Sequence, residues 1–203
     1  MDVNANLVRE LRDKTGAGVM DCKKALAESG GDLEKAAVWL REKGIAQAAK
    51  RAGRVASEGS VGSYIHAGGK LGVLVEVNCE SDFVAKTPEF QTLVKEIAMQ
   101  IAAANPRCVR REELPPEVIE QERQIYASQS AGKPEQVINK IVEGKLEKFF
   151  RDVILVEQAW VRDPNRTIGD VIGEYVGKLG EKIEIRRFSR FQLGENLDGK
   201  AAA

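Results

Sequence analysis

The apolar residues of this chain change their spacing from one region to the next, and this change limits the fold more than any other feature. Over the first 43 residues they recur at the spacing of helices with one buried face. They form three groups: Leu7, Val8 and Leu11; Val19, Cys22, Ala25 and Leu26; Leu33, Ala36, Ala37 and Leu40. Glycine-containing breaks separate the groups, so we expect a three-helix domain over residues 1–44, with Asp32 as an N-cap and Gly44 as a C-cap.

A period of two replaces the helical spacing further along the chain. Apolar residues alternate before and after a glycine-containing turn at residues 66–70, which predicts a β-hairpin. Residues 182–193 have the composition of a third strand, so we expect an antiparallel three-stranded sheet in a core over residues 60–194. Residues 45–59 are rich in Ala, Lys and Arg and have little to bury, and they are interpreted as a linker.

Helices complete the predicted core. Thr87 and Pro88 suit the N-cap and first position of one helix, and the Thr167 region begins another. Two helices with a short connection predict a projecting helical hairpin at about 115–150. The fold class is therefore α+β, and residues 195–203 are predicted to be a disordered tail.

Composition excludes several classes of protein. Thirty-one basic residues balance thirty-one acidic ones, so no net charge favours DNA or an anionic membrane surface. The cysteines, Cys22, Cys79 and Cys108, are odd in number and widely spaced, which argues against a disulfide framework and a zinc site. No apolar run approaches the ~20 residues of a membrane span, and the N-terminus lacks a signal peptide pattern. We expect a cytoplasmic protein.

The sequence also lacks the residues of an enzyme. The nearest approach to a phosphate-binding loop is Gly173 followed by Gly177, Lys178 and Leu179, which has the wrong spacing and ends in an apolar residue. His66 is the single histidine of the chain and lies in a glycine-rich turn, which makes a histidine metal site impossible and general base catalysis improbable. We therefore predict no catalytic residue, no metal, no cofactor and no direct nucleotide binding.

One segment, residues 79–86, has the composition of an exposed tip. Asp82 and Phe83 follow an apolar strand directly, and surface turns commonly carry functional residues. A charge and an aromatic ring on such a turn could enter another protein. The alternative, which spacing alone favours, is that Phe83 packs inward while Ser81 or Asp82 caps a helical turn.

Two further sets of residues allow a function in binding. Basic residues cluster at Lys50, Arg51 and Arg54 and again at Arg186, Arg187 and Arg190, which leaves an RNA-binding module as an alternative. Val19 and Met20 follow a glycine-containing turn and could belong either to a core or to a partner-binding surface.

Three motifs resemble those of a known family. TGAGVMDCKKAL at residues 15–26, followed by WLREKG at 39–44, is similar to the N-terminal signature of translation elongation factor Ts. EVNCESDFVA at 76–85 resembles the second signature of that family, and GKP at 132–134 with VEGKL at 142–146 extends the likeness. The resemblance covers residues 2–195, with Ser81 where the family usually has threonine.

The resemblance implies a guanine-nucleotide exchange factor for elongation factor Tu, with a ubiquitin-associated-like N-terminal domain. It implies that Asp82 and Phe83, with Ser81 and Val84, reach the magnesium site of elongation factor Tu. It also implies that Arg12, Val19 and Met20 dock on the nucleotide-binding domain of that partner. Because the chain has a single sheet core, it resembles the short, homodimeric members of the family. A binding partner of elongation factor Tu without exchange activity is the remaining alternative.

Overall fold

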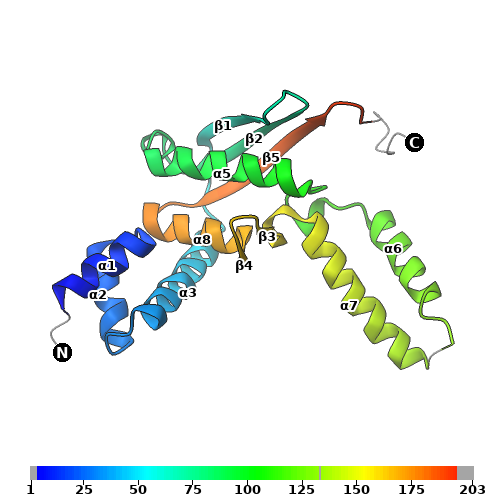
Figure 1. Cartoon of the computed structure of the whole chain (residues 1–203), viewed down its shortest axis with the longest axis horizontal. Helices are drawn as coiled ribbons and strands as arrows, with labels where there is room; N and C mark the ends of the chain where they lie inside the picture. The colour runs from blue at the N-terminus through cyan, green and yellow to red at the C-terminus, as the bar shows by residue number, and fades with distance from the viewer. Residues whose placement is uncertain (1–3, 133, 196–203) are drawn as a thin grey trace. The chain divides into compact units, whose positions relative to one another are not determined.

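The computed structural model describes residues 4–132 and 134–195, and its order of helices and strands is that of an α+β protein (Figure 1). The chain forms two compact units, each made of separate stretches of sequence. The first consists of Met1–Ser60, Val77–Leu93 and Gly169–Glu184, and the second of Val61–Glu76, Val94–Ile168 and Ile185–Ala203. The predicted fold class is confirmed.

Three helices begin the first unit: α1 (Ala5–Thr15), α2 (Val19–Glu28) and α3 (Leu33–Arg51). The predicted N-cap of α3 is confirmed, because the Asp32 carboxylate accepts hydrogen bonds from the backbone N–H groups of Glu34 and Lys35, each at 3.0 Å. Gly16 ends α1 in the left-handed conformation, at φ 67°. The three helices share one core of small and branched residues, namely Leu11, Cys22, Ala25, Leu26 and Ala36.

The helix end predicted at Gly44 is wrong, because α3 continues to Arg51. Gly44 is instead the point where α3 crosses α8 (Ile168–Leu179): a Cβ atom there would lie 2.8 Å from the carbonyl oxygen of Gly173. The close approach requires glycine inside a helix, a role that sequence spacing does not distinguish from a cap. Residues 45–51 of the predicted linker are therefore helical, and the division into domains at 1–44, 45–59 and 60–194 stays a prediction.

The predicted three-stranded antiparallel sheet is confirmed, with the order β1 (Glu58–Ile65), β2 (Leu71–Cys79) and β5 (Ile183–Gln192) (Figure 1). The hairpin turn closes with a hydrogen bond of 2.9 Å from the His66 N–H to the Leu71 carbonyl. Gly68 and Gly69 have φ of 91° and 70°, which the turn requires. Gly62 lets Val94 approach β1, since a Cβ there would lie 2.2 Å from the Val94 Cγ1 atom.

Helix α5 (Pro88–Ala104) begins as predicted, with the Thr87 hydroxyl accepting a hydrogen bond of 3.2 Å from the Phe90 N–H. Its buried face has helical spacing and consists of Phe90, Leu93, Val94, Ile97, Ala98 and Ile101. The sequence did not predict two short 3-10 helices, η1 (Arg111–Glu113) and η2 (Leu155–Glu157), or a pair of short strands, β3 (Ala159–Trp160) and β4 (Asp163–Thr167). Elements this short carry no detectable periodicity.

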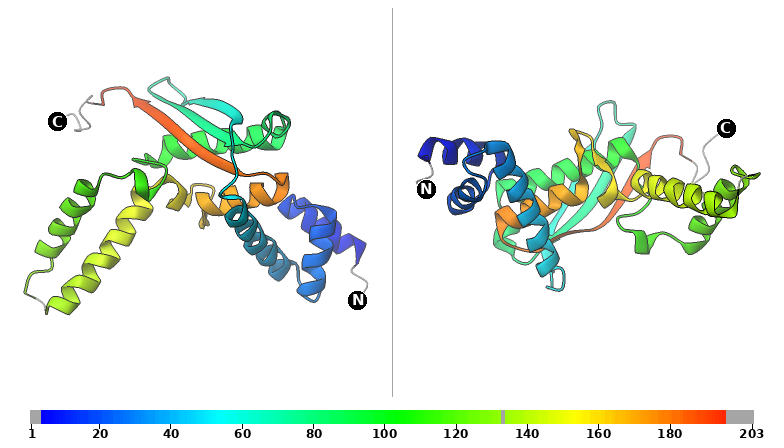
Figure 2. Two further views of the ribbon diagram at one scale, coloured as in Figure 1. Left: turned by 180° about the vertical axis from the view of Figure 1, so that it is seen from behind. Right: turned by 90° about the horizontal axis from the view of Figure 1, so that it is seen from below.

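The predicted helical hairpin is formed by α6 (Pro116–Ser128) and α7 (Glu135–Val153), which lie side by side in both views of Figure 2. Its core includes Val142, Leu146, Phe149 and Phe150. At the base, the Arg111 guanidinium binds Glu147 at 2.8–2.9 Å and Glu157 at 2.5–2.6 Å, and it stacks on the Phe150 ring at 4.3 Å. The two carboxylates balance the charge of this half-exposed guanidinium, and the Phe150 ring adds a cation–π contact.

The predicted tail at residues 195–203 lies outside the described residues except for Glu195. The Glu195 carboxylate accepts hydrogen bonds from the Arg190 guanidinium at 2.5 Å and the Gln192 N–H at 3.1 Å. Within residues 4–132 and 134–195, no helix has the length and apolar character that crossing a membrane would need.

Candidate functional site

The wedge segment, residues 81–84, follows the end of β2 and contains the start of α4 (Asp82–Ala85). Ser81 has extended backbone, at φ −131° and ψ 150°, and its hydroxyl accepts a hydrogen bond of 3.4 Å from the Val84 N–H. The Phe83 side chain is 88% exposed. The alternative from the sequence is thus half right: Ser81 caps the turn, but Phe83 does not pack inward.

Two charged side chains flank the exposed ring. Asp82 pairs with Lys86 at 2.6 Å, one helical turn away, and both side chains are largely exposed. The hydrogen bond to Asp82 raises the pKa of the Lys86 ammonium. Exposed pairs of this kind contribute little free energy, so the Asp82 carboxylate is free to exchange Lys86 for a cation of a partner.

The opposite side of α4 is anchored. Ala85 is buried, and its carbonyl accepts a hydrogen bond of 2.7 Å from the Gln91 amide of α5. The Val84 carbonyl accepts one of 2.8 Å from the Thr87 hydroxyl. A four-residue helix therefore has one attached side and one side that presents Phe83 to solvent.

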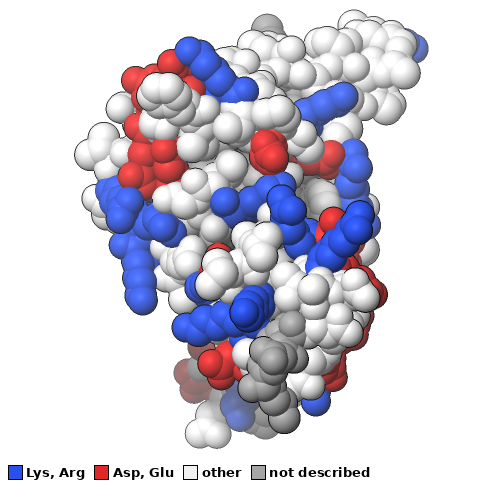
Figure 3. Space-filling view, turned by 90° about the vertical axis from the view of Figure 1, so that its left-hand side faces the viewer, with Lys and Arg blue, Asp and Glu red and all other residues white. Residues whose placement is uncertain are grey.

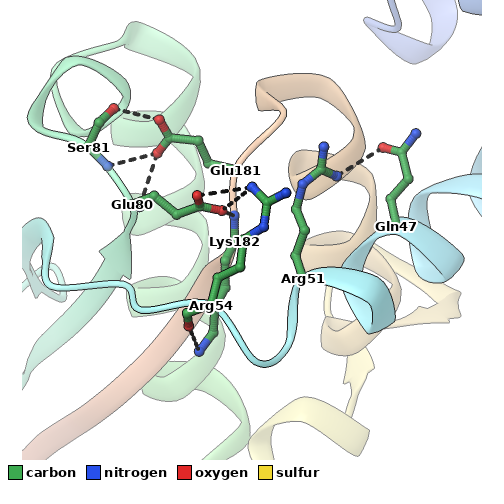
Figure 4. Close-up of polar contacts among 7 residues, drawn as sticks. All are labelled: Gln47, Arg51, Arg54, Glu80, Ser81, Glu181 and Lys182. Carbon is green, nitrogen blue, oxygen red and sulfur yellow. Dashed lines mark hydrogen bonds and ion pairs between the residues drawn. The ribbon is translucent and has the colours of Figure 1, made fainter.

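A second set of contacts, which we call the clasp, consists of Glu80, Ser81, Glu181 and Lys182 (Figure 4). The Glu181 carboxylate accepts hydrogen bonds from the backbone of Glu80 (3.0 Å), the backbone of Ser81 (2.9 Å) and the Ser81 hydroxyl (2.5 Å). In return the Glu80 carboxylate accepts one of 2.6 Å from the Lys182 N–H. Each segment therefore binds the backbone of the other through a glutamate carboxylate.

Arg54 extends the clasp to the residues after α3. Its guanidinium donates to the Glu80 carboxylate at 3.1–3.3 Å, and its carbonyl accepts from the Lys182 ammonium at 2.9 Å (Figure 4). Sequence reasoning missed Glu181, Lys182 and the role of Arg54. Glu181 and Ser81 are 100 positions apart, and a single sequence has no signal that joins them.

Cys79, at the base of the wedge segment, is a buried neutral thiol. Burial and the nearby Glu181 carboxylate raise its pKa to about 11, and its thiol donates to the Ser81 carbonyl at 3.2 Å. A thiol with a raised pKa is a poor nucleophile. In the part of the chain that the structure describes, Cys22, Cys79 and Cys108 are free and buried, and no group of His, Cys, Asp or Glu has the arrangement of a metal site.

The residues predicted to dock on a partner, Arg12, Val19 and Met20, lie on α1 and α2, and we call them the docking surface. All three side chains are exposed, with Val19 at 51% and Met20 at 75%, so Val19 and Met20 do not belong to the core. Val19 and Met20 are the first two residues of α2, after Gly18, which is the N-cap and makes no side-chain hydrogen bond. The docking surface and the wedge segment belong to the same compact unit.

The basic clusters of the sequence are mostly paired with neighbours in the structure. Arg51 binds the Gln47 amide at 3.3 Å, Arg187 binds Glu76 at 2.7 Å, and Arg190 binds Glu195. On the face shown in Figure 3, lysine and arginine side chains are interspersed with uncharged and acidic ones. On this face, the mixture is unlike the continuous basic groove that non-specific RNA binding uses.

Comparison with known proteins supplies the family. The family model described as "Elongation factor TS" matches residues 23–195. The chain is 56% identical to elongation factor Ts of Desulforamulus reducens, over 97% of this chain and 92% of the relative. It is 60% identical to elongation factor Ts of Anaeromyxobacter sp. strain K, over 98% and 92%, and 58% identical to that of Thermoanaerobacter sp. strain X514, over 97% of both. The chain thus belongs to the elongation factor Ts family.

Proposed function

We propose that this protein is a guanine-nucleotide exchange factor for elongation factor Tu and that it acts by inserting Phe83. The observation that carries this proposal is a large aromatic side chain, 88% exposed, at the tip of an anchored four-residue helix. An exposed phenylalanine has no role in the core of its own chain, and exposed apolar groups mark interaction sites. Membership in the elongation factor Ts family supports the identity of the partner.

The mechanism needs no catalytic side chain. A factor that binds the nucleotide-free partner more tightly than the GDP complex must weaken GDP binding by the same factor. Each ~1.4 kcal/mol of such coupling lowers nucleotide affinity tenfold. The factor speeds exchange in both directions, and the supply of GTP determines the net direction.

The wedge segment would produce this coupling at the magnesium site of the partner. Asp82 and Phe83, supported by Ser81 and Val84, would displace the groups that hold the ion. A bound magnesium ion neutralises phosphate charge, so its displacement leaves the phosphates of GDP without their counter-charge. GDP then dissociates faster.

The docking surface would supply affinity instead. Arg12, Val19 and Met20 present one cation and two apolar groups on a helical module with its own core. Their contact with the nucleotide-binding domain of elongation factor Tu would hold the factor while the wedge segment acts. Loss of this contact should weaken binding without slowing release in the saturated complex.

We also propose that the factor is a homodimer that forms a 2:2 complex with elongation factor Tu. The support is an exposed apolar surface on the sheet, made by Val61, Ile65, Leu74, Phe191 and Leu193. An open pocket of about 490 Å³ is lined in part by Ile65 and Leu71 of the hairpin and by Phe191 and Leu193 at the end of β5. A second copy pairing through its own sheet would cover this surface. A monomeric mass at working concentration by light scattering would contradict the dimer.

The exchange proposal is tested by stopped-flow release of fluorescent GDP from elongation factor Tu, with the chain titrated to saturation. We expect release at saturation to accelerate by at least about tenfold, which corresponds to a barrier to release lowered by ~1.4 kcal/mol. Saturable binding without acceleration would identify a partner that lacks exchange activity. RNA binding that weakens steeply with salt, with no effect on GDP release, would identify the RNA-binding alternative.

A further inference from the structure

The orientation of Phe83 has to come from outside the wedge segment. A helix of four residues is too short to be stable by itself, because nucleation fixes several residues for few hydrogen bonds. The ring is 88% exposed, so packing does not hold it either. The direction of the ring is therefore set by the backbone of α4, which is held at its C-terminal end by Ala85 and at its N-terminal end by the turn at Glu80 and Ser81.

Glu181 holds that turn through hydrogen bonds to consecutive residues. One carboxylate oxygen accepts from the Glu80 and Ser81 N–H groups, and the other accepts from the Ser81 hydroxyl. Hydrogen bonds to an ionised acceptor are roughly twice as strong as neutral ones. Because the Ser81 hydroxyl donates to Glu181, its lone pairs remain available to accept from the Val84 N–H as the helix cap.

The clasp also fixes Glu181 itself. Lys182, the next residue, donates its N–H to the Glu80 carboxylate, which Arg54 contacts as well (Figure 4). Glu181 follows α8 and precedes β5, two regular elements that limit its movement. The carboxylate is thus a fixed point against which the wedge segment is oriented.

We propose that Glu181 is a positioning residue for nucleotide exchange, which acts by fixing the orientation of Phe83 through Ser81. The proposal rests on the proposed exchange function and adds a residue that would touch neither nucleotide nor magnesium ion. Without its carboxylate, the turn at Glu80 and Ser81 loses its acceptors, and α4 samples other orientations. Displacement of a reacting group by about 1 Å can cost on the order of a hundredfold in rate.

The first test is a double-mutant cycle between Glu181→Ala and Phe83→Ala, measured by release of fluorescent GDP from elongation factor Tu at saturation. Glu181→Ala should slow release by about tenfold in the native background, on the scale of a lost charged hydrogen bond. It should change release less than about twofold when Phe83 is already alanine, since coupled residues are non-additive. Equal slowing in both backgrounds would overturn the proposal.

Two variants separate positioning from loss of folding. Glu181→Gln keeps one carbonyl oxygen to accept from the two N–H groups, so it should recover a substantial part of the rate lost in Glu181→Ala. Glu76→Gln is the matched control: it removes a half-buried carboxylate that pairs with Arg187 and lies four residues before Glu80, outside the hydrogen bonds of the clasp, so it should leave the rate unchanged. Two results would refute the positioning role of Glu181: GDP release as slow with Glu181→Gln as with Glu181→Ala, or equal slowing of release by Glu76→Gln.

Amide hydrogen exchange of the free protein tests the positioning claim without the partner. Glu181→Ala should raise the exchange rates of residues 80–84 by about tenfold or more, because their turn loses its hydrogen-bond acceptors. Protection of α1 to α3 should stay unchanged. If the native chain failed to accelerate GDP release, the proposed function would fall, while this measurement would still decide whether Glu181 holds the wedge segment. Unchanged protection at residues 80–84 would refute that role.

Discussion

The wedge segment and the docking surface expose similar apolar side chains but are supported in different ways. Val19 and Met20 extend from a helix whose other face packs into a core of Leu11, Cys22 and Leu26. Phe83 extends from a four-residue helix that depends on hydrogen bonds to Glu181, 100 positions from Ser81. A docking surface on a packed helix suits binding. The orientation of Phe83, in contrast, is determined by a small number of hydrogen bonds.

Removal of the core beneath the docking surface should have the largest effect. Leu26→Ala should destabilise the helical module by about 2–5 kcal/mol, because it leaves a cavity at a fully buried position. Amide exchange should then rise throughout α1 to α3, while residues 80–84 keep their protection. Thermal unfolding and exchange by mass spectrometry measure both effects, and equal loss of protection at the wedge segment would show that the two regions share one support.

Gly44 tests whether the two regions are connected through the crossing of α3 and α8. Gly44→Ala should destabilise the protein by about 1–3 kcal/mol, because the added carbon meets the Gly173 carbonyl at 2.8 Å. Movement of α8 would displace Glu181 and lower the protection of residues 80–84.

Gly144 in α7 is the matched control for Gly44. A Cβ atom at Gly144 has open space, so Gly144→Ala should stabilise the protein by roughly 0.5–1 kcal/mol through helix propensity. Chemical denaturation of both variants checks the opposite signs. Stabilisation of similar size in both would mean that the close approach of α3 and α8 has no energetic consequence.

Met20→Ser tests the contribution of the docking surface alone. Loss of an apolar contact of this size should raise the half-saturating concentration for GDP release by about three- to tenfold, or ~0.7–1.4 kcal/mol. The rate at saturation should not change, since the wedge segment is intact. A lower saturating rate with unchanged half-saturation would assign Met20 to the release step.

The smallest expected effect is the dependence of the clasp on pH. The hydrogen bond from Lys182, followed by that from Arg54, lowers the pKa of Glu80 in the folded protein. Because the pKa of Glu80 is lower in the folded protein, its hydrogen bonds contribute stability at pH values above the ordinary pKa of glutamate. This stability is lost as the pH falls through the folded-state pKa. Lowering the pH below the ordinary pKa of glutamate should therefore raise amide exchange at residues 80–84 and 182. Glu80→Gln should remove this acid-dependent part, and an identical pH profile in that variant would contradict the assignment.

Much of the fold follows from spacing and turn residues. Helical periodicity identified α1 to α3, alternation identified the hairpin of β1 and β2, and Thr87 with Pro88 marked the start of α5. Gly44 was misinterpreted because a glycine that allows two helices to cross and a glycine that ends a helix look alike in sequence. The short strands β3 and β4 have too few residues for a period.

The candidate site was predictable only in part. Sequence indicated that Ser81 or Asp82 caps a helical turn beside Phe83, but spacing alone favoured an inward Phe83. Its exposure depends on how α4 is attached, through Ala85 and the clasp. Glu181 could not be predicted, because its role arises only when the end of α8 and the end of β2 come together in the folded chain.

The most direct test of the central claim is stopped-flow GDP release from elongation factor Tu with Phe83→Ala, titrated to saturation beside the native chain. Our account predicts that the saturating rate falls by at least about tenfold, while the half-saturating concentration changes by less than about threefold, since ~1.4 kcal/mol of coupling is lost and the docking surface is intact. An unchanged saturating rate, with or without weaker binding, would contradict the claim that Phe83 drives nucleotide release.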